Sequence, residues 1–89
     1  MYILKETKIF RKKLLKIDDK IFQKFFPILE RIEKGPPFEK KYNVHILNGK
    51  YNKYYSINLT GDFRIIFDID NQNKIIHLLD IGSHSQLYG

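Results

Sequence analysis

Histidine and tyrosine near the end of this chain are the residues best suited by type and spacing to chemistry on a nucleic acid. His84 follows a strand-like run and a glycine, and Tyr88 comes four residues later. A residue at a strand end sits on a loop held by a rigid scaffold, where binding and catalytic residues concentrate. An imidazole exchanges protons near neutral pH, and a tyrosine ring either stacks on a base or only packs. We therefore interpret segment 81–89 as half of a site.

The other half is expected on the preceding strands, where each candidate also has a structural explanation. His45 lies mid-strand among apolar neighbours, and a histidine so placed is structural rather than catalytic by roughly two to one. His77 is expected to be a packed or edge residue. Asp62 either orients an imidazole or only ends a turn. Arg64 either grips a phosphate with its guanidinium fork or only pairs with Asp62 or Asp80.

Several other kinds of site are not indicated. Three scattered histidines make no zinc signature, and the chain has no phosphate-binding glycine loop or nucleophile elbow. We therefore expect no metal and no cofactor. The absence of cysteine suits a reducing cytoplasm. No apolar run is long enough for a membrane span or a signal peptide, so a soluble cytoplasmic protein without membrane contact is expected.

Length and charge set the scale of the molecule. The 89 residues predict one small domain, 1–89. The formal charge is +6, and ten of the 16 Lys and Arg residues lie within residues 1–34. This basic half is either an ordinary solvated helix surface or a footprint for RNA or for an acidic protein partner.

The first half of the chain has helical periodicity. Residues 2–4 predict a short inner strand. Thr7 is placed to cap a first helix, and Asp18 to cap a second that runs to residue 32. Pro27 predicts a kink in this second helix, or two shorter helices. Its core stripe is expected at positions 21, 25, 28 and 32, widened by positions 22, 26 and 29.

The second half has strand periodicity. Four strands are predicted at residues 42–47, 54–59, 62–69 and 74–81. The apolar faces agree only if Leu59 lies opposite Phe63 around a three-residue loop at 60–62, which places Asn58 opposite Arg64. The order is therefore β-α-α-β-β-β-β, an α+β fold with an antiparallel sheet and two helices on one face.

Four segments together resemble the YafQ branch of the RelE/ParE toxin superfamily. They are GSHSQLYG at 82–89, HILNG at 45–49, YSINL at 55–59 and DFRIIF at 62–67. The resemblance spans nearly the whole chain, and its RelE-like fold agrees with the predicted element order. It implies a type II toxin that cleaves mRNA in the ribosomal A site without metal. It also implies silencing by a cognate antitoxin, for which we expect an acidic, amphipathic segment.

The resemblance also implies roles for individual residues. The catalytic positions match His45, Asp62, His84 and Tyr88. Arg64 matches an arginine that contacts phosphate in RelE-like toxins. We assign His45 as the base that activates a ribose 2′-OH and His84 as the acid that protonates the leaving 5′ oxygen. Further RNA or phosphate contacts are expected from Asn58, Lys50 and Lys53.

Two alternatives come from other functional classes. A ParE-like protein would inhibit DNA gyrase without cutting RNA, and a degenerate toxin would act only in a repressor complex with its antitoxin. Asn58 favours the ParE-like alternative, because YafQ-like sequences commonly have histidine there and RelE-like ones lysine. His45 and His84 favour the nuclease, because the ParE branch needs neither.

Overall fold

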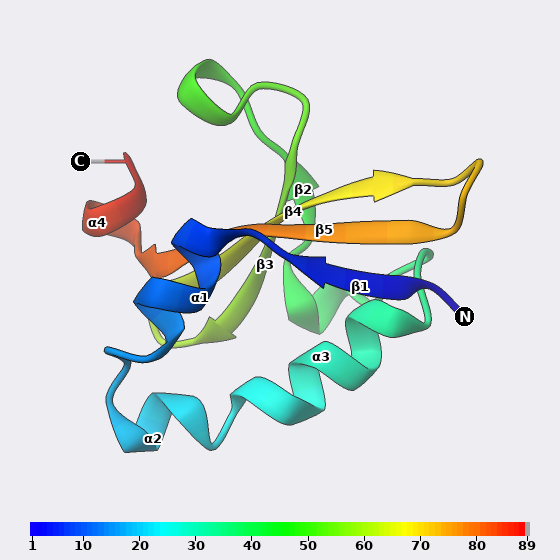
Figure 1. The fold of residues 1–89 in the computed structure, drawn as a ribbon. Coiled ribbons are helices and arrows are strands. Elements are labelled where there is room, and N and C mark those ends of the chain that lie inside the picture. Colours follow the sequence, from blue (N-terminus) through cyan, green and yellow to red (C-terminus); the bar gives the residue numbers. More distant parts are fainter. Residues whose placement is uncertain (89) are drawn as a thin grey trace.

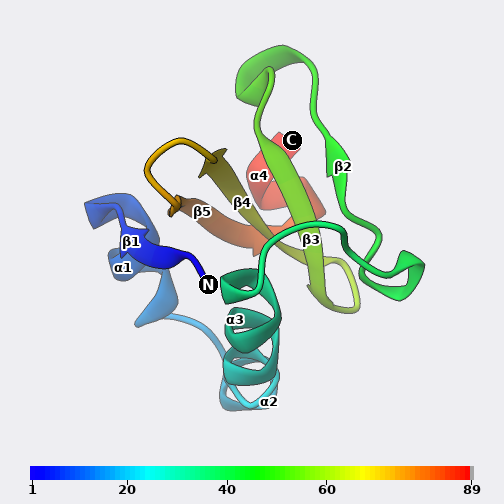
Figure 2. The same cartoon turned by 90° about the vertical axis from the view of Figure 1, so that its right-hand side faces the viewer.

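A five-stranded sheet organises the fold, with its strands in the order β1-β5-β4-β3-β2. The computed structural model describes residues 1–88. Along the chain the elements are β1 (Ile3–Glu6), α1 (Lys8–Leu14), α2 (Asp19–Phe22), α3 (Phe25–Glu33), the 3₁₀ turn η1 (Lys40–Tyr42), β2 (His45–Ile46), the 3₁₀ turn η2 (Gly49–Tyr51), β3 (Tyr55–Thr60), β4 (Phe63–Asp70), β5 (Ile75–Ser83) and α4 (His84–Tyr88). Figure 1 shows α2 and α3 below the sheet and η2 above it, and Figure 2 shows the same layers from the side. The expected α+β class is confirmed.

β1 is an edge strand, so its predicted inner position is wrong. It pairs in parallel with β5, with Ile3 beside Ile75, while every other strand pair is antiparallel. The chain passes through all three N-terminal helices before it returns to the sheet, which permits the parallel pairing. Ile3 is 61% exposed. A short apolar run does not show whether a strand lies at the edge or in the centre of a sheet, because the strands that pair with it come from distant parts of the chain.

The predicted helix starts are confirmed. The Thr7 hydroxyl accepts a hydrogen bond from the backbone of Phe10, and the Asp18 carboxylate accepts one from Lys20. The long helix is divided in two, as Pro27 predicted, although the break lies earlier, between Phe22 and Phe25. Pro27 itself occupies the first turn of α3, where a missing N–H breaks no helical bond.

The main core lies between these helices and one face of the sheet. Its fully buried residues include Phe10, Ile32, Ile57, Ile65 and Phe67. Phe25 and Ile28 of the predicted stripe are also buried, whereas Phe26, expected to widen it, is 56% exposed. The same face of β3 and β4 that the alternation predicted therefore contacts the helices.

A smaller apolar cluster covers the opposite face. It consists of Leu47, Tyr51, Ile66 and Leu87, with Leu79 packed against it. The two predicted helices do lie on one face, but the unpredicted α4 supplies Leu87 to the other. The expected strand 42–47 shrinks to two residues, because 40–42 form a 3₁₀ turn and Asn43 has a left-handed backbone, φ 50°.

The pairing of β3 with β4 sets the geometry of the candidate residues. Asn58 lies opposite Arg64, as predicted. The predicted pair of Leu59 with Phe63 is wrong: a bulge at this point pairs Thr60 with Phe63 and leaves a two-residue turn at 61–62. Gly61 there has φ +53°, a backbone conformation that favours glycine.

His77 lies half-buried on β5, opposite Asp68 of β4. Within residues 1–88, no helix has the length and apolarity that a membrane crossing requires.

Candidate functional site

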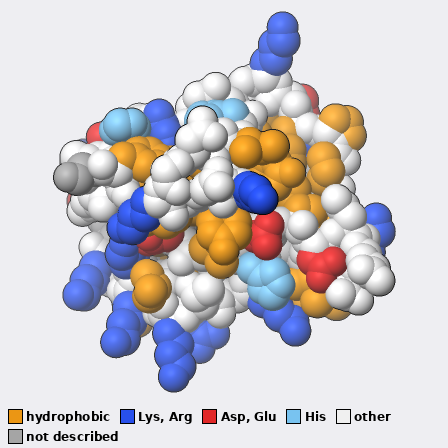
Figure 3. All heavy atoms as spheres, turned by 90° about the horizontal axis from the view of Figure 1, so that it is seen from above, with side chains coloured by type: hydrophobic (Ala, Val, Ile, Leu, Met, Phe, Trp, Pro, Cys, Tyr) orange, Lys and Arg blue, Asp and Glu red, His pale blue; other side chains and the backbone are white. Residues whose placement is uncertain are grey.

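A depression of about 280 Å³ opens on the sheet face opposite α3. It is lined by His45, Leu47, Asn48, Arg64, His84 and Tyr88. Four of the eight predicted site residues therefore meet here, from β2, β4 and α4. Figure 3 looks down on this side and shows histidines (pale blue) at separate places around apolar side chains (orange). Of the two histidines that line the depression, His45 comes from β2 and His84 from α4.

His45 is exposed on the edge strand β2, and contacts at both ring nitrogens fix the orientation of its imidazole. Its Nδ1 lies 3.0 Å from the carbonyl oxygen of Asn43, and its Nε2 lies 3.5 Å from the hydroxyl of buried Ser56. A carbonyl only accepts hydrogen bonds, so Nδ1 carries the proton in the neutral ring. Nε2 then has the lone pair, and it can accept a proton.

Helix α4 carries the other two ring side chains. Ser83 and Gln86 form a capping box: the Ser83 backbone N–H donates to Gln86 Oε1 at 2.8 Å, and the Gln86 N–H donates to Ser83 Oγ at 3.2 Å. His84 is the first residue of the helix, and Tyr88 lies one turn later with its ring centroid 4.7 Å from the imidazole. Tyr88 is 37% exposed, so part of its ring remains available to a ligand.

Arg64 makes no ion pair in the described part of the chain, so the predicted structural partners Asp62 and Asp80 do not hold it. Within residues 1–88 its Nη1 is buried without a hydrogen-bond partner, and so is Oδ1 of Asn58, the residue opposite it. A buried polar atom without a partner costs about 1–3 kcal/mol. A bound ligand that supplies the missing hydrogen-bond partner is one explanation for such an unsatisfied atom in a folded protein.

Asp62 does not line the depression. It lies exposed in the turn between β3 and β4, where its backbone oxygen accepts a hydrogen bond of 3.0 Å from the His84 N–H. Across residues 1–88 its carboxylate makes no hydrogen bond to either imidazole. The turn therefore positions the start of α4 through the backbone.

Lys50 and Lys53 are exposed on the segment at η2, next to the depression rather than in its wall. The Lys50 ammonium lies 5.2 Å from the Tyr51 ring centre. Lys53 has a left-handed backbone, φ 73°. Long, flexible cationic side chains at exposed positions such as these can follow a polyanion.

Tyr51 was not among the residues predicted from the sequence, and Asp80 was considered there only as a partner for Arg64. The buried Asp80 carboxylate accepts hydrogen bonds from Tyr51 at 2.6 Å and from Lys13 at 2.7 Å. Burial opposes its ionisation, but these two bonds together with one from the Ile81 N–H hold the pKa of Asp80 below its ordinary value. Burial, reinforced by the Asp80 contact, raises the pKa of the Tyr51 phenol. The sequence feature that could have indicated this buried contact is a single Asp within an otherwise apolar strand.

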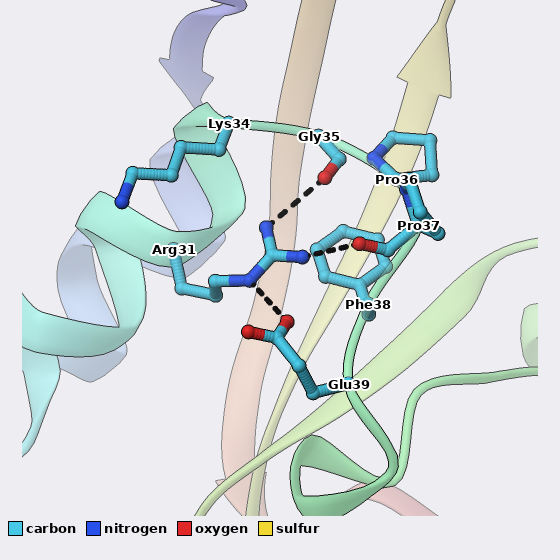
Figure 4. A pocket seen from close by; sticks show the side chains of 7 residues that line it. All are labelled: Arg31, Lys34, Gly35, Pro36, Pro37, Phe38 and Glu39. Atoms are coloured by element: carbon cyan, nitrogen blue, oxygen red, sulfur yellow. Dashed lines mark hydrogen bonds and ion pairs between the residues drawn. The ribbon is translucent and has the colours of Figure 1, made fainter.

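Larger hollows lie elsewhere: two of about 520 Å³ each, and one of about 410 Å³ that Asn58 lines together with Pro27 and Tyr42. In the first, shown in Figure 4, every guanidinium nitrogen of Arg31 is occupied: Nε by Glu39 at 2.7 Å, Nη1 by the Gly35 carbonyl at 3.0 Å and Nη2 by the Pro37 carbonyl. Three of the five guanidinium N–H donors of Arg31 are used within this segment, so the arginine fixes the loop after α3. The second lies between α1, α2 and the end of β5.

Among residues 1–88, no three His, Cys, Asp or Glu side chains gather closely enough to hold a metal ion. The depression instead offers a guanidinium with unused donor capacity, two imidazoles and an aromatic ring. This set can bind a phosphate and move protons on either side of it.

Comparison with known families and structures gives one consistent result. The model of the family described as "Bacterial toxin of type II toxin-antitoxin system, YafQ" matches residues 2–89. No curated protein sequence matches the chain.

Among solved structures, a copper-bound mutant toxin from Helicobacter pylori is 26% identical with a TM-score of 0.75, covering 99% of this chain and 100% of that one. A YafQ mutant from E. coli is 20% identical with a TM-score of 0.82 and full coverage of both chains. RelE in the archaeal RelE-RelB complex from Pyrococcus horikoshii OT3 is 24% identical with a TM-score of 0.77, covering 96% of this chain and 97% of that one.

Proposed function

This chain belongs to the YafQ family of bacterial toxins of type II toxin-antitoxin systems, and on that premise we propose that it is an endoribonuclease that cleaves mRNA on the ribosome. Its place of action would be the cytoplasm, and the reaction would need no metal. The observation that carries the proposal is the state of Arg64: a guanidinium that has no acidic partner among the described residues, in the wall of a depression shared with His45 and His84. That arrangement suits a phosphodiester.

The proposed reaction is a transesterification. His45 accepts the proton of a ribose 2′-OH at Nε2, and the 2′ oxygen attacks the adjacent phosphorus. The bond from phosphorus to the 5′ oxygen breaks, and His84 donates a proton to that oxygen. The products are a 2′,3′-cyclic phosphate and a free 5′-OH. In-line attack puts the entering and leaving oxygens on opposite sides of phosphorus, so the proposed reaction requires the imidazoles from β2 and α4 to lie on opposite sides of the bound phosphate.

Other residues have supporting roles in this proposal. Arg64 offsets the charge that develops on the phosphoryl oxygens, and Asn58 opposite it adds an amide. Tyr88 stacks on a base next to the cleaved bond. Lys50 and Lys53 contact the backbone of the strand from the rim. A catalytic role for Asp62 stays a prediction, because its carboxylate contacts neither imidazole.

Toe-printing in a purified translation reaction tests the proposal. The wild type should produce cuts within ribosome-bound mRNA, while naked mRNA at the same concentration should be cut far more slowly, because ribosomal RNA aligns the substrate. A gyrase supercoiling assay runs in parallel. Inhibition of supercoiling without RNA cleavage would establish the ParE-like alternative. Activity in neither assay would leave the degenerate toxin, and would refute the nuclease.

We also propose an antitoxin partner with an acidic, amphipathic segment, because the family is defined by such pairs and RelE is seen with RelB. The second hollow offers apolar walls from Ile17, Ile21 and Phe63, with Lys16 beside them. An acidic amphipathic helix matches both features.

Binding of the protein encoded by the neighbouring gene should be tight at low ionic strength and should weaken with added salt. No affinity for that product at low ionic strength would contradict the pairing.

A further inference from the structure

Asp80 is a carboxylate in an apolar stretch of β5, buried on the sheet face that holds the depression. It is 7% exposed and lies opposite Ile66, a member of the smaller apolar cluster. A buried charge is unfavourable unless it is paired and hydrogen-bonded. The cleavage steps proposed above do not use this residue, so its retention in this place needs another explanation.

Two side chains hold the carboxylate, one at each oxygen. Lys13 of α1 donates to Oδ1 at 2.7 Å, and the Tyr51 hydroxyl donates to Oδ2 at 2.6 Å. Both are hydrogen bonds to a charged acceptor, which are shorter and stronger than neutral ones. The carboxylate therefore ties α1 and η2 to β5, three elements that are distant in sequence.

The ring of Tyr51 continues the connection to the site. It meets the Tyr88 ring edge-on, with centroids 6.1 Å apart and planes at 82°, and Tyr88 in turn meets His84 at 4.7 Å. Helix α4 has only five residues, and so short a helix has little stability of its own. Its direction, and that of its two site side chains, therefore depends on what it packs against.

We propose that Asp80 and Tyr51 are positioning residues for the cleavage site, a role that rests on the proposed nuclease function. The Asp80 carboxylate fixes the phenol of Tyr51, the Tyr51 ring supports Tyr88, and Tyr88 restricts the imidazole of His84. The competing explanation is that the Tyr51–Asp80 bond only stabilises the fold.

The chain offers a matched control for the bond. Tyr2 and Tyr51 are each 9% exposed, and each hydroxyl donates one hydrogen bond of 2.6 Å, from Tyr2 to Asn71 and from Tyr51 to Asp80. Tyr2 does not line the depression. Both Tyr51→Phe and Tyr2→Phe should lower the urea midpoint of unfolding, and only Tyr51→Phe should disturb the site.

Two measurements report on the site. In single-turnover cleavage with saturating ribosomes, Tyr51→Phe should slow the reaction by roughly ten- to a hundredfold, the range that small misplacements of reacting groups produce. The ribosome concentration for half-maximal rate should not change. The NMR signals of the His84 ring should shift toward their positions in Tyr88→Leu, which removes the neighbouring ring. Tyr2→Phe should leave both readouts at wild-type values.

Asp80→Leu tests the other end of the bond with an apolar side chain of similar size. It should give the same rate loss and the same His84 shift, and adding Tyr51→Phe to it should slow cleavage no further, because both changes break one interaction. A Tyr51→Phe protein with wild-type cleavage and unmoved His84 signals would overturn the proposal.

If the wild type cuts no RNA, the NMR comparison by itself decides whether Tyr51 positions the His84 ring. A shift in Tyr51→Phe but not in Tyr2→Phe supports positioning. Equal signals in both variants refute it.

Discussion

Replacing Arg64 by methionine should make the protein more stable and less active. Methionine keeps an unbranched apolar chain but removes the guanidinium, whose Nη1 is buried without a partner in the described part of the chain. Leaving such a donor unsatisfied costs about 1–3 kcal/mol, so its removal should relieve a similar amount, reduced by some lost packing. We expect a net gain of about 1 kcal/mol, which for a domain of this size raises the melting temperature by about 4–8 °C.

Cleavage should change in the opposite direction. A hydrogen bond from a charged group to a phosphate oxygen is worth about 1.5–3 kcal/mol, so its loss in the transition state should slow cleavage by roughly ten- to a hundredfold. Arg11→Met is the matched control. Arg11 makes one ion pair of 3.5 Å to Glu6 and its side chain is 71% exposed, so the same charge change should alter stability by less than about 0.5 kcal/mol.

Thermal melting and single-turnover cleavage at saturating ribosomes measure the two effects separately. A melting temperature of Arg64→Met below wild type by several degrees would show that the guanidinium stabilises the fold. Wild-type cleavage by this variant would remove Arg64 from the reaction. Either result would refute the inference from its unsatisfied nitrogen.

Three further predictions concern neighbouring residues. His84→Gln should fold normally and lose most cleavage, because an amide cannot donate a proton at a useful pKa; wild-type rates would exclude His84 as the acid. Tyr88→Leu should slow cleavage by roughly ten- to a hundredfold through a lost stacking ring, and should cost far less stability than Phe67→Ala, a core truncation worth about 3–5 kcal/mol; urea unfolding and cleavage assays on both variants decide this. Asp80 has a pKa below its ordinary value of 3.8, so its ionised form stabilises the fold above pH 3.8, and this contribution is lost as the pH falls through the lowered pKa. The unfolding free energies of wild type and Asp80→Asn should therefore converge on acidification. A difference between the two free energies that stays constant with pH would contradict the lowered pKa of Asp80.

Local rules determined much of this protein from the sequence alone. The caps at Thr7 and Asp18, the division of the long helix into two and the core alternation of β3 and β4 each depend on residues close in sequence. The facing pair Asn58–Arg64 followed from the same alternation, because a one-residue shift would have turned the apolar face to solvent. The motifs that identified the family also span only a few residues each.

Even α4 had a local signal, since Ser83 and Gln86 have the spacing of a capping box. The strand-like run before it obscured that signal.

Tertiary structure decided the contacts that join distant parts of the chain. β1 is an edge strand because, among the described residues, it pairs with β5 alone, 72 residues later, and nothing in residues 2–4 specifies that neighbour. Asp62 meets His84 through its backbone rather than its carboxylate, because the bulge in β3 fixes where the turn lies. Asp80 finds Lys13 and Tyr51 only after three elements have packed. Sequence periodicity specifies which face a side chain occupies, but the partner on that face depends on the packing of the whole domain.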